Sequence, residues 1–235
     1  MRQLNTKIFA DGADLAALAK LCANPAIRGF TTNPTLMRKA GVSDYEAFAR
    51  SALELVGDRP ISFEVFSDEI DEMERQARKL ATLGRNVYVK IPVSNTRRQP
   101  VDDIVKKLSH AGVQVNVTAV MTLAQVERLA KCLHGGAPSN ISIFAGRIAD
   151  TGVDPLPMMR KALDMVRPSP SIEIIWASPR ELLNVVQSSD IGCHIITVTS
   201  DILAKLPLLG KDLDEYSLDT VKMFHGDATA AGFRL

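Results

Sequence analysis

Short apolar runs rich in β-branched residues alternate with longer amphipathic stretches along the whole chain. The apolar runs predict eight β-strands, at residues 7–11, 29–33, 61–66, 86–93, 113–120, 141–148, 172–178 and 193–200. Between them, apolar residues recur at helical spacing, which predicts eight helical segments, at residues 13–22, 43–56, 68–83, 101–111, 122–134, 154–166, 179–188 and 201–206. A last, partly frayed helix is expected in the tail at residues 212–231.

Regular alternation of strands and helices is typical of parallel sheets with right-handed crossovers. Eight such units within 235 residues favour a closed (β/α)8 TIM barrel over an open sheet. A dinucleotide-binding sheet is disfavoured further, because no glycine-rich turn follows the first strand. No linker or break in composition divides the chain, so we predict a single barrel domain over residues 1–235 with an additional C-terminal helical tail.

One charged residue, Lys90, lies within the apolar run NVYVKIPV at residues 86–93. Side chains alternate along a strand, so Val87, Val89 and Ile91 face one way and Lys90 faces the other. On an exposed edge strand this lysine would discourage sheet pairing. In a strand covered on both faces, burial would instead disfavour the charged ammonium, and a neutral lysine attacks carbonyl groups to form a Schiff base.

Polar residues gather at the carboxyl ends of the predicted strands, where TIM barrels have their active sites. Taken singly, each has an ordinary explanation, such as helix capping by Asp11 or Asn33. Their joint occurrence around Lys90 favours one site. In strand order the candidates are Asp11; Thr31 and Asn33; Glu64; Lys90; Asn116 and Thr118; Ser142, Phe144 and Arg147; and Ser178 and Arg180.

These residue types suit cleavage of a carbon–carbon bond in a sugar. Asp11 and Glu64 are available for the proton transfers of Schiff-base chemistry, and Thr118 could hold a water molecule that relays protons. Asn33 and Asn116 could bind sugar hydroxyls. Arginine binds phosphate in a bidentate manner, so Arg147 and Arg180, together with Ser178, predict an anion site suited to a sugar phosphate.

Composition excludes several other classes of function. The chain is 46% hydrophobic, enough for a large core, and its 28 Lys and Arg against 27 Asp and Glu give no electrostatic footprint for nucleic acid. No segment reaches the roughly 18 apolar residues of a membrane span, and the first residues lack the apolar core of a signal peptide. The three well-separated cysteines favour a reducing compartment, so we expect a cytoplasmic protein. The four histidines show no metal-site spacing, and we expect neither a metal nor another cofactor.

Five motifs, in order along almost the whole chain, resemble the transaldolase family, including its short bacterial branch and the related fructose-6-phosphate aldolases. They are GFTTNPTL at residues 29–36, VYVKIPV at 87–93, NVTAV at 116–120, FAGRIAD at 144–150 and WASPRE at 176–181. The pairing of TTNP with VKIPV at this spacing is the most specific part of the resemblance.

The resemblance implies specific roles for most of the candidates, and Thr31 is expected to help bind the substrate. Lys90 would form the Schiff base, Asp11 would be the acid and base of carbon–carbon cleavage, and Glu64 and Thr118 would flank the catalytic water. The dihydroxyacetone pocket and the phosphate site would be lined by Asn33, Asn116 and Ser142, and by Arg147, Ser178 and Arg180, respectively. We also expect sugar phosphates as substrates and a homo-oligomer as the assembly.

Two positions bear on the type of reaction. Family members that act as aldolases tend to have Gln where this chain has Glu64, and Tyr where it has Phe144. A tyrosine hydroxyl there could help to protonate the enamine, which a phenyl ring cannot do. Transfer of the three-carbon unit is therefore favoured over its release. The alternatives are a fructose-6-phosphate-type lyase and a non-catalytic barrel that binds sugar phosphates, although the presence of Lys90, Asp11 and Glu64 together argues against the latter.

The chain departs from the family pattern in several places. After Lys90 it has SNTRRQP, where the family usually has a Thr-x-Glu-Gly turn, so Arg97 and Arg98 would lie on a loop above the barrel mouth. That loop is either a solvated basic loop or a feature that recognises an unusual anionic substrate. Gly12, Trp176 and Pro179 are further departures, and they leave the identity of the natural sugars open.

Overall fold

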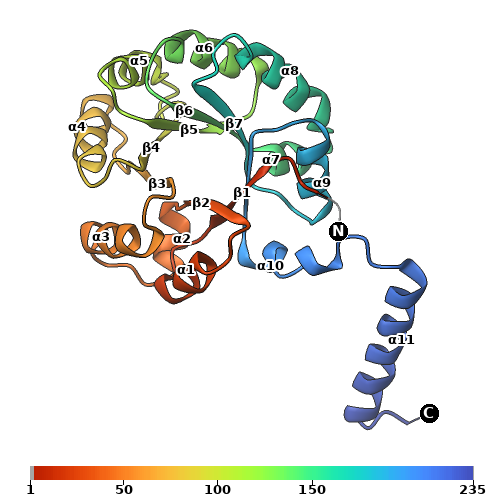
Figure 1. Cartoon of the computed structure of the whole chain (residues 1–235). Helices are drawn as coiled ribbons and strands as arrows, with labels where there is room; N and C mark the ends of the chain where they lie inside the picture. The colour runs from red at the N-terminus through yellow and green to blue at the C-terminus, as the bar shows by residue number, and fades with distance from the viewer. Residues whose placement is uncertain (1–2, 235) are drawn as a thin grey trace.

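Eight parallel strands close into a barrel in the computed structural model, which describes residues 3–234 (Figure 1). The ring closes because β1 pairs with β8, from Lys7 opposite Ile195 to Ala10 opposite Val198. The (β/α)8 fold predicted from the sequence is thus confirmed. The strands are β1 Lys7–Asp11, β2 Ile27–Thr31, β3 Ile61–Glu64, β4 Val87–Pro92, β5 Val115–Val120, β6 Ser139–Ile143, β7 Ile172–Trp176 and β8 Ile195–Val198.

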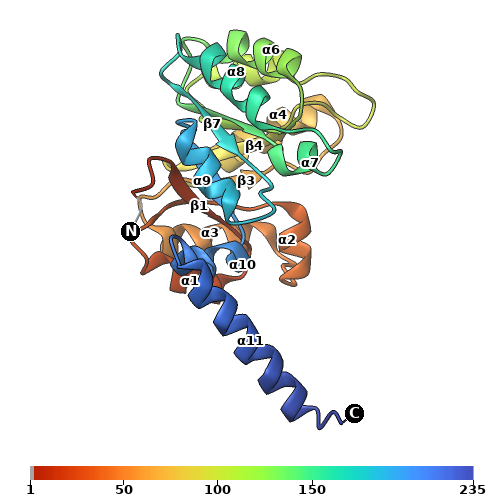
Figure 2. The ribbon, with the colours of Figure 1, turned by 90° about the vertical axis from the view of Figure 1, so that its right-hand side faces the viewer.

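Helices form an outer layer around the barrel (Figures 1 and 2). Side-chain caps begin several of them, such as Asp44 at the start of α3 and the Thr122 capping box at the start of α6. In order they are α1 Leu15–Cys22, α2 Pro34–Lys39, α3 Tyr45–Val56, α4 Ile70–Ala81, α5 Asp102–His110, α6 Leu123–Leu133, α7 Ala145–Ala149, α8 Leu156–Val166, α9 Leu183–Asp190, α10 Ser200–Leu203, the 3-10 turn η1 Leu206–Leu208, and α11 Leu213–Ala230.

The predicted sixth strand, residues 141–148, is wrong in its second half. The strand ends at Ile143, and α7 begins immediately afterwards. A close approach explains the change, because a Cβ atom on Gly146 would lie 1.6 Å from the carbonyl oxygen of Ser178. Only glycine, which has no side chain, lets α7 lie this close to the end of β7. The sequence pattern does not indicate this contact, because the segment is mostly apolar and therefore resembles a strand.

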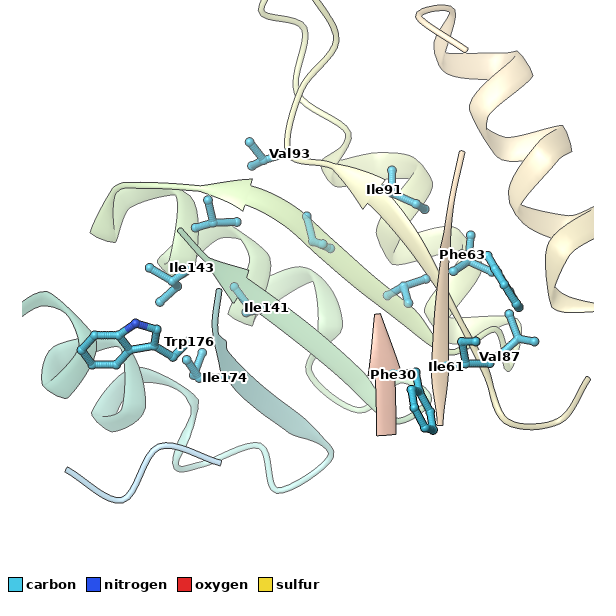
Figure 3. Packing of buried hydrophobic residues seen from close by; sticks show 14 of the residues in the cluster. Phe30, Ile61, Phe63, Val87, Ile91, Val93, Ile141, Ile143, Ile174 and Trp176 are labelled. Atoms are coloured by element: carbon cyan, nitrogen blue, oxygen red, sulfur yellow. The ribbon is translucent and has the colours of Figure 1, made fainter. Parts of the chain in front are cut away.

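The main apolar core lies between the outer faces of the strands and the helices. In β4, Val87, Val89 and Ile91 are at most 2% exposed, and all three belong to this core, as the alternation of the sequence predicts. Figure 3 shows part of the same cluster, from Phe30 and Phe63 to Trp176. Trp176, a departure from the family pattern, therefore packs away from the barrel interior.

A separate, smaller core fills part of the barrel interior. It consists of Phe9, Ile175, Ala177 and Ile195, with Phe144 packed against it. The ring of Phe9 fits because the neighbouring strand has Gly29, where a Cβ atom would lie only 2.5 to 2.7 Å from three atoms of that ring. This inner core provides a floor below the carboxyl ends of the strands.

The C-terminal tail forms α11, which extends away from the barrel (Figures 1 and 2). None of its residues is buried, and it exposes Leu213, Leu218, Val221, Met223 and Phe224. Within residues 3–234, no helix combines the length and the apolar character that crossing a membrane requires.

Candidate active site

A cavity of about 580 Å³ lies at the carboxyl ends of the strands. Eleven of the twelve residues that the sequence singled out line it, from strands on every side of the barrel. They are Asp11, Thr31, Asn33, Glu64, Lys90, Thr118, Ser142, Phe144, Arg147, Ser178 and Arg180. An adjoining, mostly apolar cavity of about 570 Å³ lies among α1, α2 and α10 and shares Asp11 with the first. We take the first as the candidate site because it contains Lys90.

Lys90 is buried inside the barrel, with 6% of its surface exposed. Its Nζ lies 3.2 Å from a carboxylate oxygen of Glu64 and donates a hydrogen bond of 3.1 Å to the carbonyl oxygen of Thr32. Glu64 lies directly opposite Lys90 on the neighbouring strand, so the register of the β3–β4 pair creates this contact. The ammonium is therefore placed against one negative charge and one backbone dipole in a largely dry environment.

Glu64 is itself held in place from the helical layer. Tyr45, the first residue of α3, donates a 2.6 Å hydrogen bond from its hydroxyl to the Glu64 carbonyl oxygen. Burial raises the pKa of this tyrosine, so its hydroxyl stays protonated and remains a donor. The amphipathic pattern of residues 43–56 predicts a helix there and gives no sign of this contact.

Asp11 forms the end of a hydrogen-bonded chain. Thr31 donates to its carboxylate at 2.7 Å, and the same hydroxyl lies 2.6 Å from that of Thr197. Because Thr31 has one proton to give, Thr197 must donate to Thr31. Burial raises the pKa of Asp11, while the charge of Lys90 and the bond from Thr31 lower it in part. Asp11 is thus a stronger base than an exposed aspartate.

Thr118 and Ala119 both line the cavity, although neighbouring residues of a strand normally face opposite ways. Ala119 has φ of +60°, and the β5–β6 register shifts between Val117 and Val120. This irregularity in β5 turns both residues toward the site. The Thr118 hydroxyl is buried and has no hydrogen-bond partner among residues 3–234, so it is free to bind a molecule in the cavity.

The two candidate asparagines are partly committed to contacts within the protein. Asn33 caps α2, where its Oδ1 accepts from the backbone N–H of Leu36 at 3.0 Å, which leaves its amide N–H groups for the cavity. Asn116 does not line the cavity. It is completely buried and lies opposite Lys90 in the β4–β5 register, where it donates to Ser62 at 3.0 Å and accepts from Ser142 at 2.7 Å. Its predicted contact with sugar hydroxyls would pass through Ser142.

The three residues of the predicted anion site lie at the rim of the cavity, Arg147 in α7 after β6, and Ser178 and Arg180 after β7. The Arg147 guanidinium lies over the Phe144 ring, 5.7 Å from its centroid. Arg180 donates to the Ser178 hydroxyl at 2.9 Å and binds Asp150 through two hydrogen bonds, one of them 2.8 Å long. Ser178 has φ of +59°, a left-handed conformation that non-glycine residues rarely adopt.

The loop at residues 94–100 does not line the cavity. Arg97 is paired with Glu69 through two hydrogen bonds of 2.7 and 2.8 Å, and Arg98 is exposed. Asp68 binds the backbone and the hydroxyl of Thr96 from the same side. These contacts favour the interpretation of this segment as a solvated loop tied to the start of α4.

Several residues of the site are not among the candidates that the sequence indicates. Lys39, Thr197 and Thr199 line the cavity, and Asp150 binds one of its arginines. Applying the strand-end rule to the eighth strand would have found Thr197. Asp150 stands in the FAGRIAD motif, but its distance in sequence from Arg180 conceals their contact. In the part of the chain that the structure describes, no group of three or more His, Cys, Asp or Glu could hold a metal ion.

The site thus combines a buried lysine–carboxylate pair with two arginines at the rim of a (β/α)8 barrel. Residues 8–235 match the sequence model of the Transaldolase/Fructose-6-phosphate aldolase family. The chain belongs to this family, whose members include transaldolases and aldolases.

Several relatives align over nearly their full length. Proteins named "Probable transaldolase" from Methanococcus maripaludis and from a Thermoanaerobacter species are 31% and 32% identical to this chain, and each alignment covers 91% of this chain and 96% of the relative. A protein of the same name from Clostridium kluyveri is 33% identical, with 85% and 89% covered.

Among solved structures, a putative lyase/mutase from Burkholderia cenocepacia superposes with a TM-score of 0.58. The superposition covers 98% of this chain and 85% of that one, at 13% sequence identity. Identity this low shows a shared fold and nothing about activity.

The raised pKa of Asp11 predicts how a neutral replacement changes stability with pH. Because the folded-state pKa exceeds the unfolded one, the contribution of Asp11 to stability is complete below its ordinary pKa and is lost as the pH rises through the folded value. Asp11→Asn should therefore be more stable than the wild type at pH 8, and the gain should shrink toward pH 4. Denaturant midpoints measured across this range test it.

Asp68, on the surface loop before α4, provides a control of opposite sign. Hydrogen bonds from Thr96 lower its pKa, so its contribution is present at neutral pH and is lost as the pH falls. Asp68→Asn should therefore lower the midpoint at pH 8. A constant difference between Asp11→Asn and the wild type at every pH would contradict the assignment of a raised pKa.

Proposed function

We propose that the protein is a transaldolase that transfers a dihydroxyacetone unit between sugar phosphates through a Schiff base on Lys90. The observation that carries the proposal is the buried contact of 3.2 Å between Lys90 and Glu64, in one cavity with Asp11 and Thr118. Membership of the family supports the reaction class. Three free thiols support a reducing compartment, and we propose the cytoplasm as the site of action.

The proposed reaction begins with proton transfer from Lys90 to Glu64. The neutral amine then attacks the C2 carbonyl of a ketose phosphate, and the resulting carbinolamine loses its hydroxyl as water to give an iminium ion. Glu64 supplies the proton for that departure, and the unpartnered hydroxyl of Thr118 is suited to binding the water as it leaves.

Carbon–carbon cleavage is assigned to Asp11. Its carboxylate removes the proton of the C4 hydroxyl, the C3–C4 bond breaks, and the bonding electrons move into the iminium to leave an enamine on Lys90. The raised pKa of Asp11 matches this task, because the carboxyl must both accept this proton and return it. An aldose phosphate then leaves, and a second one accepts the enamine by the reverse of the same step.

The side chain facing the enamine decides between transfer and release. Release of dihydroxyacetone requires protonation of the enamine carbon, and Phe144, which lines the cavity, has no proton to donate. Transfer is therefore favoured over the lyase reaction. A non-catalytic sugar-phosphate barrel is disfavoured because its fold would not need a buried lysine, whose desolvation is unfavourable.

Borohydride reduction in the presence of fructose 6-phosphate tests the Schiff base. The wild type should gain a covalent three-carbon adduct on Lys90, detected by intact mass and peptide mapping, because reduction traps the imine. Lys90→Ala should gain none. An adduct of equal yield in Lys90→Ala would exclude Lys90 as the nucleophile, whereas absence of any adduct in the wild type would favour the non-catalytic alternative.

Product analysis with and without an acceptor tests the reaction type. With an aldose phosphate present, fructose 6-phosphate should be consumed at least tenfold faster than in its absence, since only the acceptor then removes the enamine. Phe144→Tyr should increase the release of free dihydroxyacetone, provided that the new hydroxyl reaches the enamine carbon. Equal turnover of the wild type under both conditions would identify a lyase.

We also propose that the protein is a homo-oligomer that uses α11. This helix buries none of its residues against the barrel, and it exposes Leu218, Val221, Met223 and Phe224 to solvent. An apolar stretch of this kind is unusual on the surface of a monomer and typical of an interface.

Light scattering tests the assembly. The wild type should have a molar mass that is a multiple of 25.6 kDa, and the double replacement Val221→Lys and Phe224→Lys should lower it, because two charges would be buried at the interface. Lys222→Ala, on the same helix, is the matched control and should leave the mass unchanged. A monomeric wild type would contradict the proposal.

A further inference from the structure

Arg180 uses one edge of its guanidinium for Asp150 and another for Ser178. Its Nε and Nη2 atoms donate to the two carboxylate oxygens of Asp150, and its Nη1 donates to the Ser178 hydroxyl at 2.9 Å. A two-point pairing with a carboxylate fixes the plane of the guanidinium as well as its position. The terminal nitrogen that remains is thereby aimed at the serine of the anion site.

Asp150 is itself firmly placed by the backbone. It ends α7, where its N–H donates to the carbonyl oxygen of Gly146 at 2.9 Å. Gly146 in turn lies against the carbonyl of Ser178, so close that a Cβ atom could not fit. One short helix therefore carries Arg147 and Asp150 and sets both against the segment that carries Ser178 and Arg180.

The charges of the rim are compatible with an anion despite the carboxylate. Hydrogen bonding from Arg180 lowers the pKa of Asp150, so Asp150 is ionised at neutral pH. Arg147 lies over the Phe144 ring and makes no salt bridge within residues 3–234, and its charge also contributes to the lowered pKa of Asp150. Two guanidinium groups and one carboxylate leave a net positive charge at the rim.

Resting on the proposed function, we propose that Asp150 is the positioning residue of the phosphate subsite. It holds Arg180 so that the terminal guanidinium edge and the Ser178 hydroxyl face the sugar phosphate together. The pair is not needed for folding, since the two side chains are 45% and 52% exposed and exposed ion pairs add little to stability. Asp150 therefore affects the binding of phosphorylated substrates and does not affect the rate of the chemical step.

The test compares the binding of inorganic phosphate with kinetics on two ketoses. Asp150→Ala should weaken phosphate binding in calorimetric titration by about tenfold. It should raise KM for fructose 6-phosphate by a similar factor with kcat unchanged, and leave the kinetics on unphosphorylated fructose unaffected. Asp150→Asn, which keeps the shape of the side chain and one hydrogen-bond acceptor, should lose less phosphate affinity. If the alanine variant fails to fold, the comparison is made with Asp150→Asn instead. Asp164→Asn, which breaks a similar exposed pair with Arg167, is the matched control.

Dependence on Arg180 separates positioning from a direct effect. Arg180→Ala alone and the Asp150→Ala/Arg180→Ala double variant should bind phosphate equally weakly, because Asp150 acts only through Arg180. Tighter phosphate binding in Asp150→Ala would mean that the carboxylate competes with the ligand, and equal losses of kcat on both ketoses would mean a structural role. Either result overturns the proposal.

The outcome also separates this inference from the proposed function. If the wild type binds no phosphate but borohydride still traps an adduct on Lys90, the subsite is wrong and the Schiff-base chemistry stands. If phosphate binds as described and no adduct forms, the subsite is supported and the proposed reaction fails.

Discussion

The charge of Lys90 inside the barrel is the constraint on which the rest of the site depends. An ammonium removed from water is unstable unless other groups compensate for the lost hydration. Here Glu64 and the Thr32 carbonyl do so directly, and Asp11 interacts with the same charge at longer range. The compensation is incomplete around Asp11, whose pKa remains raised by burial. A site that keeps one acid poorly solvated and one amine close to a proton acceptor is prepared for proton transfer, at the expense of stability.

The barrel supports this site through its two separate cores. The outer core between strands and helices is large and almost wholly apolar, so it can stabilise a fold whose interior is polar toward the carboxyl ends of the strands. The inner core around Phe9 forms a floor, and it depends on Gly29 for room. Asn116 links Ser62 and Ser142 into one chain of hydrogen bonds, so these three buried side chains supply partners to one another.

Strand ends were predictable from the sequence because two simple rules apply to them. Alternation in β4 places the side chain of Lys90 on the other face of the strand from Val89 and Ile91. A parallel barrel brings the carboxyl ends of all its strands to one end of the barrel. These two rules are enough to predict eleven residues that line one cavity, although the sequence gives no distances. What remained hidden depends on irregular backbone. Residues 144–149 have the composition of a strand, yet the contact of Gly146 with Ser178 makes them a helix. The pairing of Asp150 with Arg180 follows from that helix and has no signature in either segment.

Within residues 3–234, two of the three non-glycine residues with positive φ line the cavity, and the third is Arg98 in the loop at residues 94–100. Ala119 and Ser178 both have positive φ, a conformation that is unfavourable by about 1 kcal/mol or more for a residue with a Cβ atom, and both line the site. At Ala119 the strain accompanies the register shift that turns Thr118 inward, and at Ser178 it accompanies the close approach of α7. Regular strands alone would present the lysine and its carboxylates. The two strained residues bring in the neighbouring groups, a free hydroxyl beside the proposed reaction centre and a serine beside the arginines. The fold thus supplies the reactive pair through its regular geometry and the surrounding binding groups through local departures from it.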